Sequence, residues 1–188
     1  MSIIDINLMS TDEKELVTRA VQGDGEAFAR LYEGNLNKVY RYIYLKIGNH
    51  AECEDFTQEV FLKALEAIGS YRWRNLSFAA WLLRIAHNHL IDHFRRESKV
   101  EKVPWDDNVG HVESANPAAV AEQRIQAKEL AEKVNRLAPA QREVILLRFG
   151  GELSVAEVAS VLGKTTGTVK ALQHSGILAL RKTMLASG

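Results

Sequence analysis

The segment from residue 71 to residue 75 alternates aromatic and basic side chains and is the first candidate for chemistry in this sequence. Aromatic rings can stack on unpaired bases while arginines neutralise the phosphates of the same strand. The pattern therefore predicts contact with single-stranded nucleic acid, and Trp73 is the better candidate for a base contact. The segment consists of Tyr71, Arg72, Trp73, Arg74 and Asn75.

The helix expected next, from Phe78 to Arg96, is apolar around nearly its whole circumference, out to Ile91 and Phe94. We expect Trp81 to lie in the core. One narrow polar stripe remains, and such a stripe on an otherwise buried helix indicates a surface with a specific partner. The polar stripe consists of Arg84, Asn88, Asp92 and Arg95, and Arg96 completes the candidate nucleic-acid contacts of this helix.

Residues 153–182 carry the pattern of a helix–turn–helix motif. Ser154 and Glu157 form a capping box that opens a short helix, and Gly163 allows a tight turn. A second helix, capped by one of two threonines, is expected from near Gly167, and its exposed N-terminal residues can enter the major groove. The candidate DNA contacts are Thr166, Thr168, Lys170, Ala171, Gln173, His174 and Ser175. A plain helical hairpin with a polar face is the alternative.

The second helix of this motif has an expected interior face and one weak point. The interior face consists of Val169, Leu172, Leu178 and Leu180. Glycine inside a helix costs about 1 kcal/mol relative to alanine. We therefore expect the helix to fray near Gly176.

A helix expected from about Glu52 to Ala67 has two contrasting faces. Its core face consists of Phe56, Val60, Ala64 and Ile68, with Phe61 and Leu65 alongside. The opposite face is acidic with a leucine inside it, which suits docking onto a basic helix better than plain solvation. This acidic strip consists of Asp55, Gln58, Glu59, Leu62 and Glu66. A merely solvated acidic face is the alternative.

Metal and redox chemistry find little support in the sequence. His89 and His93 have the i, i+4 spacing that can bind a metal, but no third ligand is evident and the segment lacks the Glu of H-E-x-x-H. Cys53 is the sole cysteine, and its acidic neighbours Glu52 and Glu54 should raise the pKa of its thiol. We therefore expect no metal, nucleotide or other cofactor.

The composition is that of an ordinary soluble globular protein. The chain has 188 residues, of which 46% are hydrophobic and 26% charged. No apolar run approaches the roughly 20 residues of a membrane helix, and the first residues lack the pattern of a signal peptide. We therefore expect a cytoplasmic protein with no membrane insertion. Few prolines and few β-branched runs favour helices throughout.

The net formal charge is zero, but the charge is unevenly distributed. Residues 71–99 hold six basic and two acidic residues, and residues 164–188 hold four basic and no acidic residues. Residues 100–123, between them, hold one basic and five acidic residues. Separate basic segments are the electrostatic pattern expected for contact with phosphate backbones.

These signals predict an all-α protein with two small helical domains, of which the C-terminal one is a helix–turn–helix. An acidic, flexible linker without sustained periodicity joins them. Asn116 and Pro117 provide a cap and a proline that open the second domain, and Pro139 opens a further helix. The expected organisation is a flexible leader at 1–11, a first domain at 12–97, a linker at 98–116 and a second domain at 117–186.

Three stretches resemble one bacterial family. PAQREVILLRFGGELSVAEVASVLGKTTGTVKALQHS resembles region 4 of the extracytoplasmic function (ECF) sigma factors. AECEDFTQEVFLKAL resembles the polymerase-binding segment of region 2, and FAAWLLRIAHNHLIDHFRR strongly resembles regions 2.3 and 2.4. The motifs occur in the family's order and separation, and the resemblance covers about residues 12–97 and 117–186. One departure is Ser175-Gly176, where many relatives carry a basic residue.

The resemblance implies a transcription initiation factor and not an enzyme. Such a protein binds core RNA polymerase, with the acidic strip on the clamp of the largest subunit and region 4 on the flap. It directs the polymerase to promoters, where the 71–75 segment and the polar stripe read and melt the minus-ten element. The helix–turn–helix grips the minus-thirty-five element. An anti-sigma factor is the further partner that the resemblance implies.

Two other readings remain open at this point. A conventional helix–turn–helix regulator, whose N-terminal domain binds a ligand or dimerises, explains residues 139–182 but not the acidic strip or the aromatic–arginine segment. A small enzyme in the first domain would rely on His87, His89, His93 and Asp92. No nucleophile or third metal ligand supports that enzyme.

Overall fold

The structure is a computed structural model that describes residues 3–72, 76–97 and 131–185. Every regular element within these ranges is helical, which confirms the all-α prediction. The elements are α1 (Ile3–Val21), α2 (Gly25–Ile47), α3 (His50–Ala67) with a 3-10 turn (Ile68–Ser70), α4 (Phe78–Glu97), α6 (Pro139–Ile145) with a π-helical turn (Leu146–Gly150), α7 (Val155–Leu162) and α8 (Thr166–Leu185). The expected linker at 98–116 lies outside the described residues.

Helix α2 has a well-defined cap at each end. The Asp24 Oδ1 accepts hydrogen bonds from the backbone N–H groups of Glu26 (3.0 Å) and Ala27 (3.1 Å), which is the capping geometry expected of Asp. At the other end, Gly48 adopts the left-handed conformation (φ 80°) that glycine tolerates best. The apolar stripe between these caps is buried and packs α2 against α1, α3 and α4.

The N-terminal residues correct one prediction. Helix α1 begins at Ile3, so residues 3–11, which we expected to form a flexible leader, are helical. The stretch contains no glycine or proline, and nothing in it ends a helix.

Three apolar side chains are more exposed than their patterns predict. Leu65, expected beside the core face of α3, is 49% exposed. Ile91 and Phe94, in the outer half of α4, are 48% and 41% exposed. These side chains belong to apolar helix faces but lie outside the buried core. Among the described residues, no element covers the outer sides of α3 and α4 at these positions.

Helix α8 corrects two further predictions. Gly176 does not interrupt the helix, which continues to Leu185. Gly176 is buried, and a Cβ there would lie 3.1 Å from the Ile145 Cγ1. The glycine therefore lets α8 approach α6 closely, and this packing offsets its poor helix propensity. Leu178, expected inside, is 51% exposed because it lies on the side of α8 turned away from α6 and α7.

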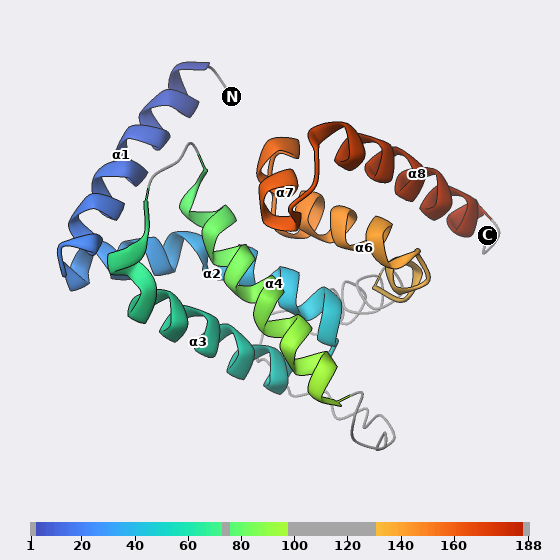
Figure 1. Cartoon of the computed structure of the whole chain (residues 1–188), viewed down its shortest axis with the longest axis horizontal. Coiled ribbons are helices and arrows are strands. Elements are labelled where there is room, and N and C mark those ends of the chain that lie inside the picture. The colour runs from blue at the N-terminus through green and yellow to red at the C-terminus, as the bar shows by residue number, and fades with distance from the viewer. Residues whose placement is uncertain (1–2, 73–75, 98–130, 186–188) are drawn as a thin grey trace, which may run out of the picture.

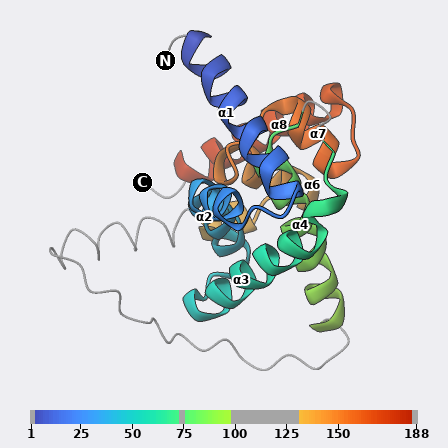
Figure 2. The same cartoon turned by 90° about the vertical axis from the view of Figure 1, so that its left-hand side faces the viewer.

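The two helical groups correspond to the two predicted domains, and they also contact each other. Figure 1 shows α6, α7 and α8 gathered beside the α1–α4 bundle, and Figure 2 shows the same grouping from the side. Helix α7 contacts α4, and the π-helical turn contacts α2. Buried side chains of both groups form one continuous core.

Candidate nucleic-acid interface

The acidic strip lies exposed on α3. All five of its residues are exposed, and Leu62 shows 59% of its surface to solvent. The opposite residues Phe56, Val60 and Ala64 are buried against the core, because they recur at a spacing close to one helical turn. Exposed Leu65 extends the apolar part of this surface. The result is an acidic face with an apolar centre, which suits a basic, partly apolar partner helix.

The two histidines weighed as metal ligands instead pair with carboxylates of α3. The His89 Nε2 lies 2.5 Å from the Glu59 Oε2, and the His93 Nε2 lies 3.3 Å from the Glu52 Oε1. The Phe56 ring contacts both imidazoles, with centroid distances of 4.9 and 4.7 Å. These contacts connect α4 to the back of the acidic strip. Among the residues that the structure describes, no group of three His, Cys, Asp or Glu side chains is placed to hold a metal ion.

Cys53 is a buried, free cysteine of α3. Burial, with a smaller contribution from Glu52, raises the pKa of its thiol to about 12. The direction matches the prediction, but the main cause is burial, which the sequence did not reveal.

The aromatic–arginine segment is described only at its ends. Tyr71 is buried, its hydroxyl donates to the Leu76 carbonyl (3.1 Å), and its ring contacts those of Phe78 and Trp81. Arg72 is exposed and donates to two nearby backbone carbonyls. Within the described part, Tyr71 therefore belongs to the core and Arg72 to the surface. The remaining candidates, Trp73, Arg74 and Asn75, lie outside the described residues.

The polar stripe of α4 is divided between solvent and α7. Asn88, Asp92 and Arg95 are exposed, as is the neighbouring Arg96. Arg84 is half-buried, and its Nη2 donates to both the carbonyl and the hydroxyl oxygen of Ser160 on α7, each at 2.7 Å. The inner end of the stripe thus contacts the C-terminal helices, whereas the side chains at the outer end are exposed to solvent.

The helix–turn–helix geometry follows the sequence pattern closely. Both hydrogen bonds of the capping box between Ser154 and Glu157 are present, and Gly163 ends α7 at φ 62°. The hydroxyl of Thr165, one of the two candidate caps, accepts from the Thr168 N–H at 3.1 Å, and α8 follows. The short helix, the turn and the second helix are therefore set by local interactions.

The α8 residues predicted to contact DNA fall into two groups. Two of them take part in contacts within the C-terminal bundle: the Gln173 Oε1 accepts from the Arg148 Nε (2.9 Å), and the Ser175 Oγ accepts from the Gln141 Nε2 (3.1 Å). The others are exposed, namely Thr166, Thr168, Lys170, Ala171 and His174. The exposed group is concentrated at the N-terminal end of α8, which is the end that enters a major groove in such motifs.

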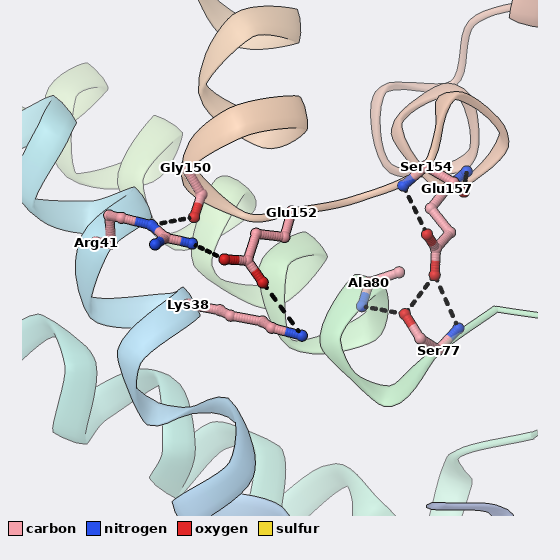
Figure 3. A network of polar contacts seen from close by, with 8 residues as sticks. All are labelled: Lys38, Arg41, Ser77, Ala80, Gly150, Glu152, Ser154 and Glu157. Atoms are coloured by element: carbon pink, nitrogen blue, oxygen red, sulfur yellow. Dashed lines mark hydrogen bonds and ion pairs between the residues drawn. The ribbon is translucent and has the colours of Figure 1, made fainter. Parts of the chain in front are cut away.

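Figure 3 shows a polar network between the two helical groups that sequence reasoning missed. The Arg41 Nη2 donates to the Glu152 Oε1 (2.6 Å), and the Arg41 Nε donates to the Gly150 carbonyl (2.7 Å). The Lys38 Nζ lies 3.7 Å from the other oxygen of Glu152. The Arg41 hydrogen bond lowers the pKa of the Glu152 carboxyl. No local sequence pattern predicts these contacts, because the partners are more than 100 residues apart in the chain.

A more buried cluster surrounds Glu143. The Lys46 Nζ donates to its Oε1 (2.6 Å), and the His87 Nδ1 and the Tyr42 hydroxyl lie 3.2 and 3.4 Å from its Oε2. Burial alone would raise the pKa of Glu143, but hydrogen bonds from His87 and Lys46 outweigh it and lower the pKa to about 2. Burial lowers the pKa of Lys46, and Glu143 partly offsets that effect. The cluster is therefore a charged pair held in the interior.

Comparison with known proteins decides the family. The Sigma-70 region 2 model matches residues 31–100, and the Sigma-70, region 4 model matches residues 134–182. The ECF RNA polymerase sigma factor SigW of Bacillus subtilis is 31% identical over 91% of this chain and 96% of its own length. The chain belongs to the ECF RNA polymerase sigma factors. This sigma factor is also 40% identical to BldN of Streptomyces coelicolor over 90% of this chain, and it spans 65% of that relative.

Membership in this family confirms the resemblance drawn from the motifs. It also confirms the predicted function in transcription initiation. The conventional regulator and the small enzyme do not account for matches to both sigma regions in order. Within the part of the chain that the structure describes, no helix is both long and apolar enough to cross a membrane.

Solved structures share the fold of this sigma factor. The structure of CnrH in complex with the cytosolic domain of CnrY covers 94% of this chain at 23% identity and a TM-score of 0.69. The sigma factor RpoE in complex with the anti-sigma factor NepR from Bartonella quintana covers 84% of this chain at 19% identity and a TM-score of 0.67.

Proposed function

We propose that this sigma factor binds core RNA polymerase through α3, directs it to promoters with α4 and α8, and promotes opening of the DNA strands. The observation that carries the proposal is that one acidic and two mainly basic surfaces are exposed on one chain: the acidic strip of α3, the outer stripe of α4 and the N-terminal end of α8. Each surface suits one partner, and none resembles a closed catalytic site. The chain acts by binding, without an enzymatic reaction or cofactor, in the cytoplasm.

The polymerase surface is the acidic strip. Asp55 and Glu59 offer carboxylates to basic residues of a clamp helix, and Leu62 supplies the apolar contact between them. Gln58 and Glu66 extend the surface along α3. The C-terminal helices make a second contact with the polymerase flap. This division assigns the clamp to region 2 and the flap to region 4.

The minus-ten surface combines the 71–75 segment with the polar stripe of α4. Arg72, Arg95 and Arg96 are exposed cations for phosphates, and Asn88 and Asp92 offer hydrogen bonds to bases. Trp73 is the proposed stacking residue, flanked by Arg74 and Asn75. Arg84 belongs to the same surface but is bound to Ser160 in this structure. Tyr71 would have to leave the core to stack on a base.

The minus-thirty-five surface is the N-terminal end of α8. Lys170 and His174 are the principal candidates for phosphate or base contact, and Thr166 and Thr168 lie at the helix N-terminus, which favours a phosphate. Ala171 can contact a thymine methyl group. Gln173 and Ser175 would have to release Arg148 and Gln141 before contacting DNA.

A protein inhibitor is the remaining proposed partner. Both solved neighbours were determined with bound partners, and in one of them the partner is named as an anti-sigma factor. We propose that a protein of that kind binds this sigma factor as well.

Reconstitution with core RNA polymerase tests the proposed function. The purified chain should co-elute with sigma-free bacterial core polymerase on gel filtration at moderate salt. Replacing Asp55 and Glu59 with Lys and Leu62 with Asp should abolish co-elution, because both the charge and the apolar contact are lost. Glu33→Lys, an exposed acid on α2, is the matched control and should leave co-elution intact. A wild-type chain that elutes as a separate homodimer would overturn the proposal.

A further inference from the structure

We propose that His89, on α4, is a positioning residue of the polymerase surface: it holds the Glu59 carboxylate of the acidic strip in the orientation that meets the polymerase. The inference rests on the proposed function of the acidic strip and deepens it, because it gives a role to a residue outside the strip. The observation that carries it is a contact between a nearly buried imidazole on α4 and an exposed carboxylate on α3.

The contact between His89 and Glu59 joins a fixed group to a solvent-exposed one. The His89 Nε2 lies 2.5 Å from the Glu59 Oε2, and the His89 side chain is 10% exposed, whereas that of Glu59 is 54% exposed. An ionised carboxylate only accepts hydrogen bonds, so the His89 Nε2 carries a proton and donates it to this bond. A carboxylate accepts through two oxygens, so Oε2 can hold the imidazole while Oε1 meets a cation of the partner.

The Phe56 ring fixes the imidazole of His89 from the core side of α3. The two ring centroids are 4.9 Å apart, and the ring planes are tilted by 43°. Phe56 itself is buried in the core. Ring contacts of this kind favour defined orientations, so the core sets the direction of the donated hydrogen bond before any partner binds.

An exposed glutamate without such a contact binds a partner less efficiently. Its side chain samples several rotamers, and ordering them during docking weakens binding by about three- to tenfold. His89 orders the Glu59 side chain when the chain folds, so the docking step no longer includes this cost. The sigma factor would therefore present a preorganised carboxylate to the polymerase.

Glu59 lies in the middle of the acidic strip. It is one helical turn from Asp55 on one side and from Leu62 on the other, and all three residues are exposed. A partner that covers Leu62 also removes water from the neighbouring carboxylate, and a desolvated charge needs an accurately placed counter-charge. The orienting contact is thus made to the central residue of the strip.

His93, one turn further along α4, makes the equivalent contact outside the strip. Its Nε2 lies 3.3 Å from the Glu52 Oε1, and its ring centroid lies 4.7 Å from that of Phe56. Both histidines should therefore stabilise the packing of α4 on α3. Only the contact of His89 reaches a residue of the polymerase surface, so His93 is a matched control for a purely structural role.

Competition for core RNA polymerase measures the affinity of each variant. Unlabelled full-length variants displace a wild-type chain, labelled at its N-terminus, from sigma-free bacterial core polymerase, and fluorescence anisotropy follows the displacement. His89→Leu removes the donor but keeps the bulk, and it should bind about three- to tenfold more weakly. His89→Gln keeps an N–H donor and should bind within about twofold of wild type, as should His93→Leu.

Two further measurements separate positioning from folding. Urea unfolding should show comparable losses of stability for His89→Leu and His93→Leu, so that stability alone cannot explain a difference in affinity. In a Glu59→Ala background, His89→Leu should have no further effect on affinity, because the group that it positions is absent.

Three outcomes would refute the positioning role. They are an undiminished affinity of His89→Leu, an equal weakening by His89→Leu and His93→Leu, and an effect of His89→Leu that persists in the Glu59→Ala background. Each of these leaves the binding of the wild-type chain to core polymerase intact, and with it the proposed function. A wild-type chain that does not bind core polymerase would contradict the proposed function itself.

Discussion

Helices α4 and α8 both carry residues proposed to read promoter DNA, yet the protein presents them differently. The N-terminal candidates of α8, such as Lys170, are open to solvent. The first candidate of α4, Arg84, is bound to Ser160 of α7. The difference arises because α8 lies at the outer edge of the chain, whereas α4 lies between the two helical groups (Figure 1). A DNA-contacting helix in the middle of a fold can be covered by other helices of the same chain. A DNA-contacting helix at the edge can be covered only by another molecule.

The largest expected effect comes from breaking the buried ion pair between the two helical groups. Glu143→Ala should reduce the free energy of unfolding by about 3–5 kcal/mol, because it leaves the Lys46 ammonium, whose side chain is 8% exposed, without its carboxylate. Urea unfolding at pH 7 measures the loss. The exposed Glu132→Ala should change stability by less than about 0.5 kcal/mol. An equally small loss for Glu143→Ala would mean that the contact between the two helical groups does not depend on this pair.

Acidification should weaken the same ion pair. The folded pKa of Glu143 is about 2, below its ordinary value of 4.5, so its stabilising contribution is complete above about pH 4.5 and is lost as the pH falls toward 2. The shift corresponds to a contribution on the order of 3 kcal/mol. Urea midpoints measured between pH 7 and pH 2.5 should therefore fall steeply below about 4.5. In Glu143→Gln the fall should be shallower, and an unchanged slope would contradict the assignment.

The next prediction concerns α8, and it tests whether close packing against α6 holds this helix in place. Gly176→Val should destabilise the chain by about 1–3 kcal/mol, because a Cβ would already lie 3.1 Å from the Ile145 Cγ1. Ala171→Val, on the exposed side of the same helix, controls for β-branching and should cost less than about 1 kcal/mol. Thermal unfolding followed by circular dichroism compares the two. Equal losses would show that α8 is held by propensity and not by packing.

The smallest expected effect concerns the cap that starts α8. Thr165→Ala should cost about 1 kcal/mol, because the Thr168 N–H loses its hydroxyl acceptor. Thr165→Ser keeps the acceptor and should stay near wild type. Hydrogen exchange at the first turn of α8 measures the change locally. Exchange that rises equally in α4 would indicate that the start of α8 is coupled to the contact between the two helical groups.

Local sequence signals predicted the elements well. Asp24, the Ser154–Glu157 capping box and Gly163 all have the roles that their types and spacing indicate. Each acts through hydrogen bonds within about one helical turn, so neighbouring residues contain the whole interaction. The same holds for the acidic strip, whose exposure follows from the helical repeat of the buried residues opposite to it.

Signals that needed a distant partner were missed or misread. The sequence alone predicts a weak point of α8 at Gly176, whereas the structure places Ile145 of α6 against this glycine. Tyr71 remains a proposed DNA contact, and in this structure its ring contacts those of Phe78 and Trp81. Neither packing contact follows from the residue types immediately beside Gly176 or Tyr71.

The sequence by itself determined the all-α fold, the two sigma regions and the exposed faces that we propose for polymerase and DNA, because caps, turns and periodicity act over a few residues. The tertiary structure alone decided that region 4 lies on region 2 and binds Arg84, Arg41 and Lys46. Those hydrogen bonds and ion pairs join residues 76 to 111 positions apart in the chain. No local pattern encodes such pairs, since their energy depends on shape and charge matched across two surfaces that lie far apart in the sequence.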